Sequence, residues 1–182
     1  MSDSNIPAAT ASMPQTSVHT IRSFSVQPQP GRIVVVAVDA SPHSKVAFDW
    51  YISNIHQASD LVVLTHIPEV PDLPLFTFKE GIHMPALEWE RALTEQIGKV
   101  RHLQNGYEEF MVDKQITFKL AGSARRSIGA GIIEVARLEN ADMIVLGTRG
   151  LSAACSALMG SVSDYISRES NIPVLIVPNN TK

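Results

Sequence analysis

The stretch GRIVVVAVDASP, residues 31–42, combines a buried strand with the start of a helix. Residues 33–38 are apolar and mostly β-branched, and no polar residue alternates with them, which is typical of a parallel strand covered on both faces. Ser41 is a favourable helix N-cap, and Pro42 suits the first helical position. A buried strand that leads directly into a helix is the repeating unit of parallel α/β proteins.

The same alternation of strands and helices continues to the end of the chain. The order βαβαβαβαβ predicts a single α/β domain of the Rossmann-like type, with a five-stranded parallel sheet and helices on both faces. Ligands bind such sheets at the carboxyl ends of the strands, so we expect functional residues directly after Val38, His66 and Leu146. The further strands are expected at residues 61–67, 116–120, 141–146 and 174–177, and the further helices at 86–104, 132–138 and 161–170.

Four segments fall outside this pattern. Residues 1–30 are rich in Ser, Thr, Gln and Pro and predict a disordered N-terminal tail, and residues 179–182 predict a short C-terminal tail. The domain would then span residues 31–178. Residues 68–85 are interrupted by prolines and predict a long irregular connection of the kind that often forms a lid. Residues 122–131 predict a flexible surface loop before the third helix, or else an extension of the binding pocket.

Composition restricts the classes of function. The 182 residues are 45% hydrophobic and 18% charged, as in an ordinary globular domain. A net charge of −3 gives no basic surface, so we expect no nucleic-acid partner. No apolar run approaches the roughly 18 residues that cross a bilayer, and the first twenty residues lack the features of a secretory signal. The single cysteine, Cys155, excludes an internal disulfide, so we expect a cytoplasmic protein with no membrane partner.

Two glycine-containing segments carry the strongest functional pattern. Gly147-Thr148-Arg149-Gly150 follows an expected strand and, after nine residues, Gly160-Ser161-Val162-Ser163 precedes an expected helix. Glycine permits positive φ and lets the backbone approach a ligand closely. The first turn of a helix offers unpaired N–H groups that bind phosphate. Taken alone, the same residues also fit a glycine turn followed by a serine-capped helix.

Together these segments resemble the ATP-binding motif Gly-x₂-Gly-x₉-Gly-Ser of universal stress proteins. Residues 141–147 and 171–177 are similar to the fourth and closing strands of that family, and residues 33–44 and 60–67 resemble its first two. The resemblance covers residues 31–178. It implies a module for stress response or signalling that binds an adenine nucleotide, ATP or else AMP or ADP, with Mg²⁺ or Mn²⁺ carried on the phosphates.

The resemblance also implies which residues bind the nucleotide. It places Asp39 and the backbone near Val38 beside the adenosine, and the main chain of Ile67 at the adenine edge. From the residues alone, Asp39 could instead cap the next helix, and Arg149 could be a solvated loop cation. The residues implied near the ribose and the phosphates are Gly147, Arg149, Gly150, Gly160, Ser161, Val162 and Ser163.

The closing strand indicates a second kind of partner. As the last strand of an open sheet it would expose an apolar edge that needs cover. The resemblance implies the same arrangement, a homodimer through this strand. The strand consists of Val174, Leu175, Ile176 and Val177.

No catalytic or metal-binding motif is present. The sequence contains no Gly-x₄-Gly-Lys-Ser/Thr, Gly-x-Ser-x-Gly or His-Glu-x₂-His pattern. We expect His66 to be structural, His43 to be solvated and Cys155 to be a free thiol. The sequence therefore predicts no catalytic residues and at most weak ATP hydrolysis. Two alternatives stay open: a nucleotide-dependent transferase acting on a small molecule, and a protein-interaction module whose pocket is empty.

Overall fold

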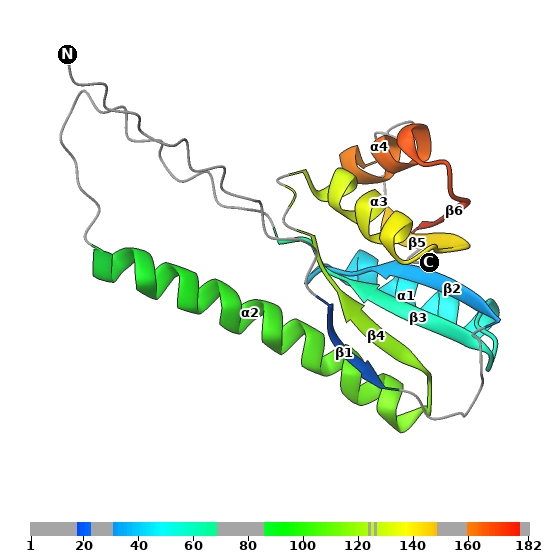
Figure 1. Ribbon diagram of the computed structural model, residues 1–182, viewed down its shortest axis with the longest axis horizontal. Helices are drawn as coiled ribbons and strands as arrows, with labels where there is room; N and C mark the ends of the chain where they lie inside the picture. Colours follow the sequence, from blue (N-terminus) through cyan, green and yellow to red (C-terminus); the bar gives the residue numbers. More distant parts are fainter. Residues whose placement is uncertain are drawn as a thin grey trace, which may run out of the picture.

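In the part of the chain that the structure describes, six strands form one sheet in the order β1-β4-β3-β2-β5-β6 (Figure 1). The structure, a computed structural model, describes residues 18–22, 31–68, 86–123, 125, 127–148 and 160–178. Strands β2 to β6 are all parallel, which confirms the expected five-stranded parallel sheet. The strands are β1 (Val18–Arg22), β2 (Arg32–Ala37), β3 (Asp60–Thr65), β4 (Phe118–Ala121), β5 (Met143–Thr148) and β6 (Val174–Pro178).

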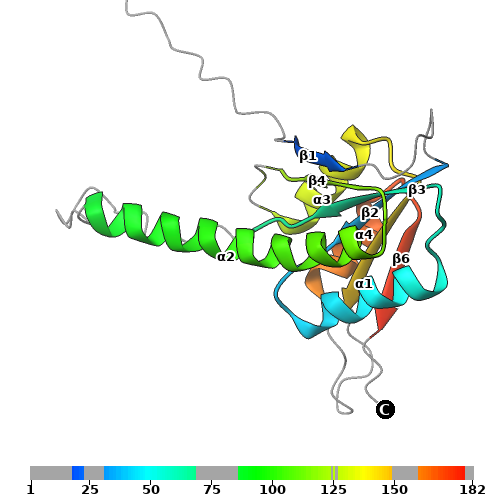
Figure 2. The same cartoon turned by 90° about the horizontal axis from the view of Figure 1, so that it is seen from below.

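Among the described residues, four helices cover the two faces of this sheet: α1 (Pro42–Asn54), α2 (Ala86–Asp113), α3 (Ile128–Leu138) and α4 (Ser161–Glu169) (Figure 2). Val34 and Val36 of β2 pack in one core cluster with residues of α1 and α2. Val35, between them, packs in a second cluster with residues of α3 and α4. All three valines are fully buried. The unbroken apolar run in β2 thus reflects a strand that is covered on both faces.

Helix α2 extends beyond the end predicted at residue 104 and reaches Asp113. Its last turns pack on α1, where the rings of Tyr107 and Phe110 lie edge-on to Phe48 at centroid distances of 4.8 and 5.6 Å. Earlier in the helix, Ile97 remains 52% exposed. The prediction ended too early because it followed the apolar period of residues 89–103, whereas the packed part of the helix lies after it.

Strand β1 was not expected. Residues Val18–Arg22 lie within the predicted disordered tail, yet they pair antiparallel with β4, so that prediction is wrong for these five residues. The strand is formed by pairing with a distant part of the chain, and sequence periodicity does not reveal such pairing. The remainder of residues 1–30, the expected lid at 69–85 and the tail at 179–182 lie outside the described residues.

The expected loop at residues 122–131 is shorter than predicted, because α3 begins at Ile128 after an N-cap at Ser127. Gly129 and Gly131 lie inside the helix, where glycine is normally unfavourable. Their positions are crowded: a Cβ on Gly129 would lie 2.5 Å from Cδ1 of Tyr165 in α4, and one on Gly131 would lie 3.1 Å from Cγ1 of Ile67. The two glycines therefore permit close packing of α3, which the local sequence does not indicate.

Asp60 ties the amino ends of β2 and β3 to α1. Its carboxylate accepts two hydrogen bonds from Arg32, at 2.9 and 2.8 Å, and one from the hydroxyl of Tyr51 at 3.0 Å. The backbone N–H of Gln57 donates a further bond at 2.9 Å. Desolvation acts to raise the pKa of Asp60, but these bonds outweigh it and the pKa lies below its usual value.

None of the described helices is long and apolar enough to cross a membrane.

The first prediction concerns this buried carboxylate. Asp60→Asn should lower the free energy of unfolding at pH 7 by about 3 kcal/mol, because it breaks a buried ion pair from one side. Since the pKa of Asp60 is lower in the folded state, the contribution is present above about pH 4, the unfolded value, and is lost as pH falls through the folded value. Urea unfolding at pH 7 and pH 3 should therefore show a difference that shrinks in acid.

Asp49→Asn is the matched control. Asp49 pairs with Lys45 on the surface of α1, where both side chains are largely exposed, so its loss should cost at most about 0.5 kcal/mol. Equal losses for the two variants at pH 7 would contradict the structural role given to Asp60.

Candidate functional site

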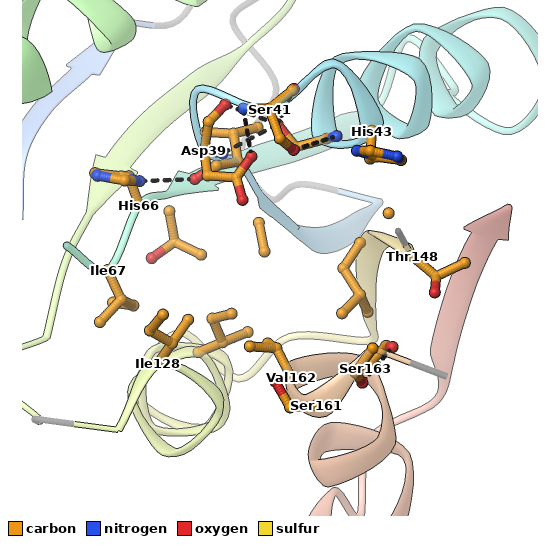
Figure 3. A pocket seen from close by; sticks show the side chains of 18 residues that line it. Asp39, Ser41, His43, His66, Ile67, Ile128, Thr148, Ser161, Val162 and Ser163 are labelled. Atoms are coloured by element: carbon orange, nitrogen blue, oxygen red, sulfur yellow. Dashed lines mark hydrogen bonds between the residues drawn. The ribbon is translucent and has the colours of Figure 1, made fainter. Parts of the chain in front are cut away.

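A cavity of about 370 Å³ lies at the carboxyl ends of β2, β3 and β5, between the start of α1 and the helices α3 and α4 (Figure 3). Beyond β2 the chain continues to β3 on one side, whereas β5 lies on the other, so the cavity is at the point where strand order reverses. Its wall consists of Ala37, Val38, Asp39, Ser41, His43, Ser44, Thr65, His66, Ile67, Ile128, Ile132, Leu146, Gly147, Thr148, Gly160, Ser161, Val162 and Ser163.

The turn between β2 and α1 is held by a small set of hydrogen bonds. Oδ1 of Asp39 accepts a bond from the N–H of Ser41 at 2.8 Å, and Oγ of Ser44 donates to the carbonyl of Asp39 at 2.8 Å. Oγ of Ser41 in turn accepts from the N–H of Ser44, the N-cap contact expected for α1. Asp39 therefore does stabilise the helix start, through one of its two oxygens.

Asp39 also carries a negative charge at the cavity wall. Desolvation acts to raise the pKa of its carboxyl, but hydrogen bonds from Ser41 and Ser44, assisted by the nearby His66, lower the pKa below its usual value. The group is consequently ionised at neutral pH. An exposed carboxylate oxygen at this position can accept hydrogen bonds from a ligand's hydroxyl groups.

One end of the cavity is apolar. Ile67, which follows β3, is buried, and Ile128 of α3 lies in the same part of the wall (Figure 3). Ile132 of α3 also lines the cavity and packs in the same core cluster. The strand ends beneath them are fixed together, because Nδ1 of His66 donates to the carbonyl of Val38 at 2.8 Å. This contact supports the structural role expected for His66. An apolar slot of this kind suits a flat, weakly polar group.

The opposite end is formed by the first turn of α4. Gly160 is the N-cap and has no side chain that could bond the main-chain N–H groups of the first turn. Ser161, Val162 and Ser163 line the cavity here, and Oγ of Ser163 donates to the carbonyl of Gly160 at 2.9 Å. The main-chain N–H groups of a first helical turn and the positive end of the helix dipole favour an anion at such a position.

Gly147 was expected in a turn directly after the strand, where glycine allows positive φ. It lies instead within β5 and has no left-handed backbone. A Cβ at this position would lie 2.5 Å from the carbonyl oxygen of His43 and 2.8 Å from its carbonyl carbon. Glycine is needed here because β5 passes close to the first turn of α1, which brings both elements to the cavity.

The cavity brings most of the predicted site residues together. Arg149 and Gly150 lie outside the described residues. His43 was expected to be solvated, but it is partly buried, its Nδ1 has no hydrogen-bond partner, and it lines the cavity. Sequence reasoning also missed Thr65 and the α3 residues Ile128 and Ile132. The predicted residues found in the wall are Val38, Asp39, Ile67, Gly147, Gly160, Ser161, Val162 and Ser163.

Five parallel strands, helices on both faces and a cavity where strand order reverses define a Rossmann-like α/β domain. The chain belongs to the universal stress protein family, whose family model matches residues 31–178.

Known proteins agree with this assignment. The chain is 30% identical over 148 residues to a universal stress protein of Thermus aquaticus, covering 80% of this chain and 98% of that protein. It is 27% identical over 158 residues to one of Mycobacterium tuberculosis, covering 82% of this chain but 49% of the relative, so it spans about half the length of that protein. A family member from Arabidopsis thaliana, solved with AMP bound, shares the fold with a TM-score of 0.59 and 17% identity, covering 82% of this chain and 93% of that one.

The crowding at Gly147 gives the second prediction. Gly147→Ala should lower the free energy of unfolding by about 1–3 kcal/mol, because its Cβ would meet backbone atoms of α1 that cannot rotate away. Gly122→Ala is the control, since nothing lies within 4 Å of that Cβ position, and it should cause no loss. Thermal or urea unfolding measures both. A Gly147→Ala variant as stable as the wild type would contradict the close packing of β5 on α1.

Proposed function

We propose that this cavity binds an adenine nucleotide, most specifically ATP, and that the chain acts as a nucleotide-dependent stress-response or signalling module. The observation that carries the proposal is the division of the cavity into two chemically different ends. The apolar end under α3 suits a purine base, and the uncapped first turn of α4 suits phosphates. The volume of about 370 Å³ lies within the usual range for small-ligand sites.

We propose that the two ends of the cavity determine the direction in which the nucleotide lies. The base would rest against Ile128 and Ile132 with its edge at the main chain of Ile67, and the phosphates would reach Gly160, Ser161 and Ser163. The ribose would then lie near Asp39 and Val38, where an ionised carboxylate accepts bonds from hydroxyl groups and repels phosphate. We propose that Gly147, Val162, Arg149 and Gly150 complete the phosphate end.

Two further considerations support the nucleotide and its ion. The Arabidopsis relative was solved with AMP bound, and the glycine spacing from Gly147 to Gly160 resembles an ATP-binding motif. Mg²⁺ or Mn²⁺ would be carried on the phosphates, as Mg²⁺ commonly is in nucleotide sites. We propose slow hydrolysis at most, because the sequence contains no Gly-x₄-Gly-Lys-Ser/Thr, Gly-x-Ser-x-Gly or His-Glu-x₂-His motif. The cysteine content favours a reducing compartment, the cytoplasm.

An added negative charge tests the phosphate end, as the third prediction. Ser161 is exposed at the first position of α4. Ser161→Asp should weaken ATP binding at least tenfold, about 1.4 kcal/mol, because the new carboxylate would occupy the place of the phosphates. The same change should not destabilise the apoprotein, since a negative charge at a helix N-terminus is favourable. Calorimetry with ATP and thermal unfolding without it measure the two effects.

Ser167→Asp is the control on the same helix. Ser167 is exposed near the carboxyl end of α4, so the added charge there should leave ATP affinity within about twofold. Wild-type protein that binds no ATP would refute the proposed function. If Ser161→Asp binds ATP as tightly as the wild type, the phosphates do not bind at this end of the cavity.

We also propose a homodimer through β6. This strand is at the end of the sheet, next to β5 only, and Val174, Leu175 and Ile176 are only partly buried, whereas Val177 is buried. A two-fold axis would let β6 pair with the same strand of a second copy.

The fourth prediction follows from this edge. Sedimentation velocity at tens of micromolar should show a dimer, and Leu175→Lys should shift it toward monomer, because two lysines would face each other near the axis. Circular dichroism checks that the variant is folded. A wild-type chain that sediments as a monomer would contradict the proposed dimer.

A further inference from the structure

Thr65 presents a buried hydroxyl that the protein does not use. It is the last residue of β3, it is 1% exposed, and it belongs to the cavity wall. Its Oγ1 has no hydrogen-bond partner. Buried hydroxyl groups are nearly always bonded in folded proteins, because leaving one unpaired costs free energy. An unpaired group in the wall of a cavity therefore points to a partner that arrives with a ligand.

The surroundings of Thr65 explain why the protein leaves it unpaired. Its register partners in the neighbouring strands are Ala37 in β2 and Ala121 in β4, which carry only methyl groups. Ile67 and Ile132, which also line the cavity and belong to the core cluster on the α3 side of the sheet, are apolar and buried. By contrast, the hydroxyls of Ser44 and Ser163 both bond to backbone carbonyls. Thr65 thus places a hydroxyl without a partner beside apolar side chains in the cavity wall.

Its place in the sheet separates Thr65 from the phosphate end. The strand order β3-β2-β5 puts β2 between Thr65 and the end of β5. Two strand spacings amount to roughly 10 Å. A group bonded to Thr65 is therefore not the anion held at the start of α4. It belongs to the part of the ligand that enters the apolar end.

We propose that the hydroxyl of Thr65 is a specificity-determining contact that hydrogen-bonds the polar edge of the nucleobase. The inference rests on the proposed nucleotide function and extends it to base recognition. A hydroxyl can donate one bond and accept others, so it can serve a purine's ring nitrogen or its exocyclic amino group, directly or through one enclosed water. The bond forms only in the complex, and the unliganded protein retains an unsatisfied group. A site built in this way discriminates against ligands that lack the matching polar group.

Two variants that divide the side chain test the proposal, as the fifth prediction. Thr65→Val keeps the shape and removes the hydroxyl, and Thr65→Ser keeps the hydroxyl and removes the methyl group. Thr65→Val should bind ATP at least tenfold more weakly, about 1.4 kcal/mol, while its unliganded melting temperature is unchanged or higher. Thr65→Ser should bind ATP within about threefold of wild type, while its melting temperature is lower because a small cavity is left.

Inorganic tripolyphosphate is the second ligand in the calorimetry. Because it carries no base, its affinity should be the same in Thr65→Val and wild type. Thr65→Ala provides the same comparison if the valine variant does not fold. ATP affinity equal to wild type in folded Thr65→Val would overturn the inference, as would an equal loss for ATP and tripolyphosphate. The proposed function itself would instead be refuted if the wild-type protein does not bind ATP, whether or not it binds tripolyphosphate.

Discussion

Strand β2 is hydrogen-bonded to a parallel neighbour on each side, β3 and β5, and helices cover both of its faces. The middle of such a strand has neighbours on all sides, so Val34, Val35 and Val36 are paired to both strands and fully buried, and the position of β2 constrains those of its neighbours. The chain leaves β2 toward β3 on one side and reaches β5 on the other only after two further helices. Helix α1, which follows β2, packs on one face of the sheet, and α4, which follows β5, packs on the other, so the cavity lies between them at the carboxyl ends of the strands.

The parts of the fold that local sequence determines were predictable. The strand at residues 33–38 is uniformly apolar, and Ser41 with Pro42 marks the helix start, so β2, α1 and the parallel order followed from residue pattern. The parts that depend on contacts across the fold were not. Strand β1 forms only because β4 has a free edge, and the glycines of α3 are tolerated because Tyr165 and Ile67 leave no room for a side chain.

The candidate site divides in the same way. Asp39, Ile67 and Gly160 lie at strand or helix ends, and the topology of parallel sheets brings such ends together, so their place in the cavity wall followed from the order of elements. Gly147 lies there for another reason, because β5 packs against the backbone of His43. Thr65 could not be recognised in the sequence, since its hydroxyl differs from that of any strand threonine only in lacking a partner in the folded protein.

The central claim is that a nucleotide lies across the cavity with its base under α3 and its phosphates at the start of α4. A titration of the ¹⁵N-labelled full chain with ATP, followed by amide chemical shifts, tests it most directly. The account predicts that the largest shifts fall in two groups, residues 160–163 and residues 65–67, while amides near Asp60 at the opposite end of the sheet remain unchanged. Shifts concentrated near Asp60, or absent from residues 160–163, would contradict the account.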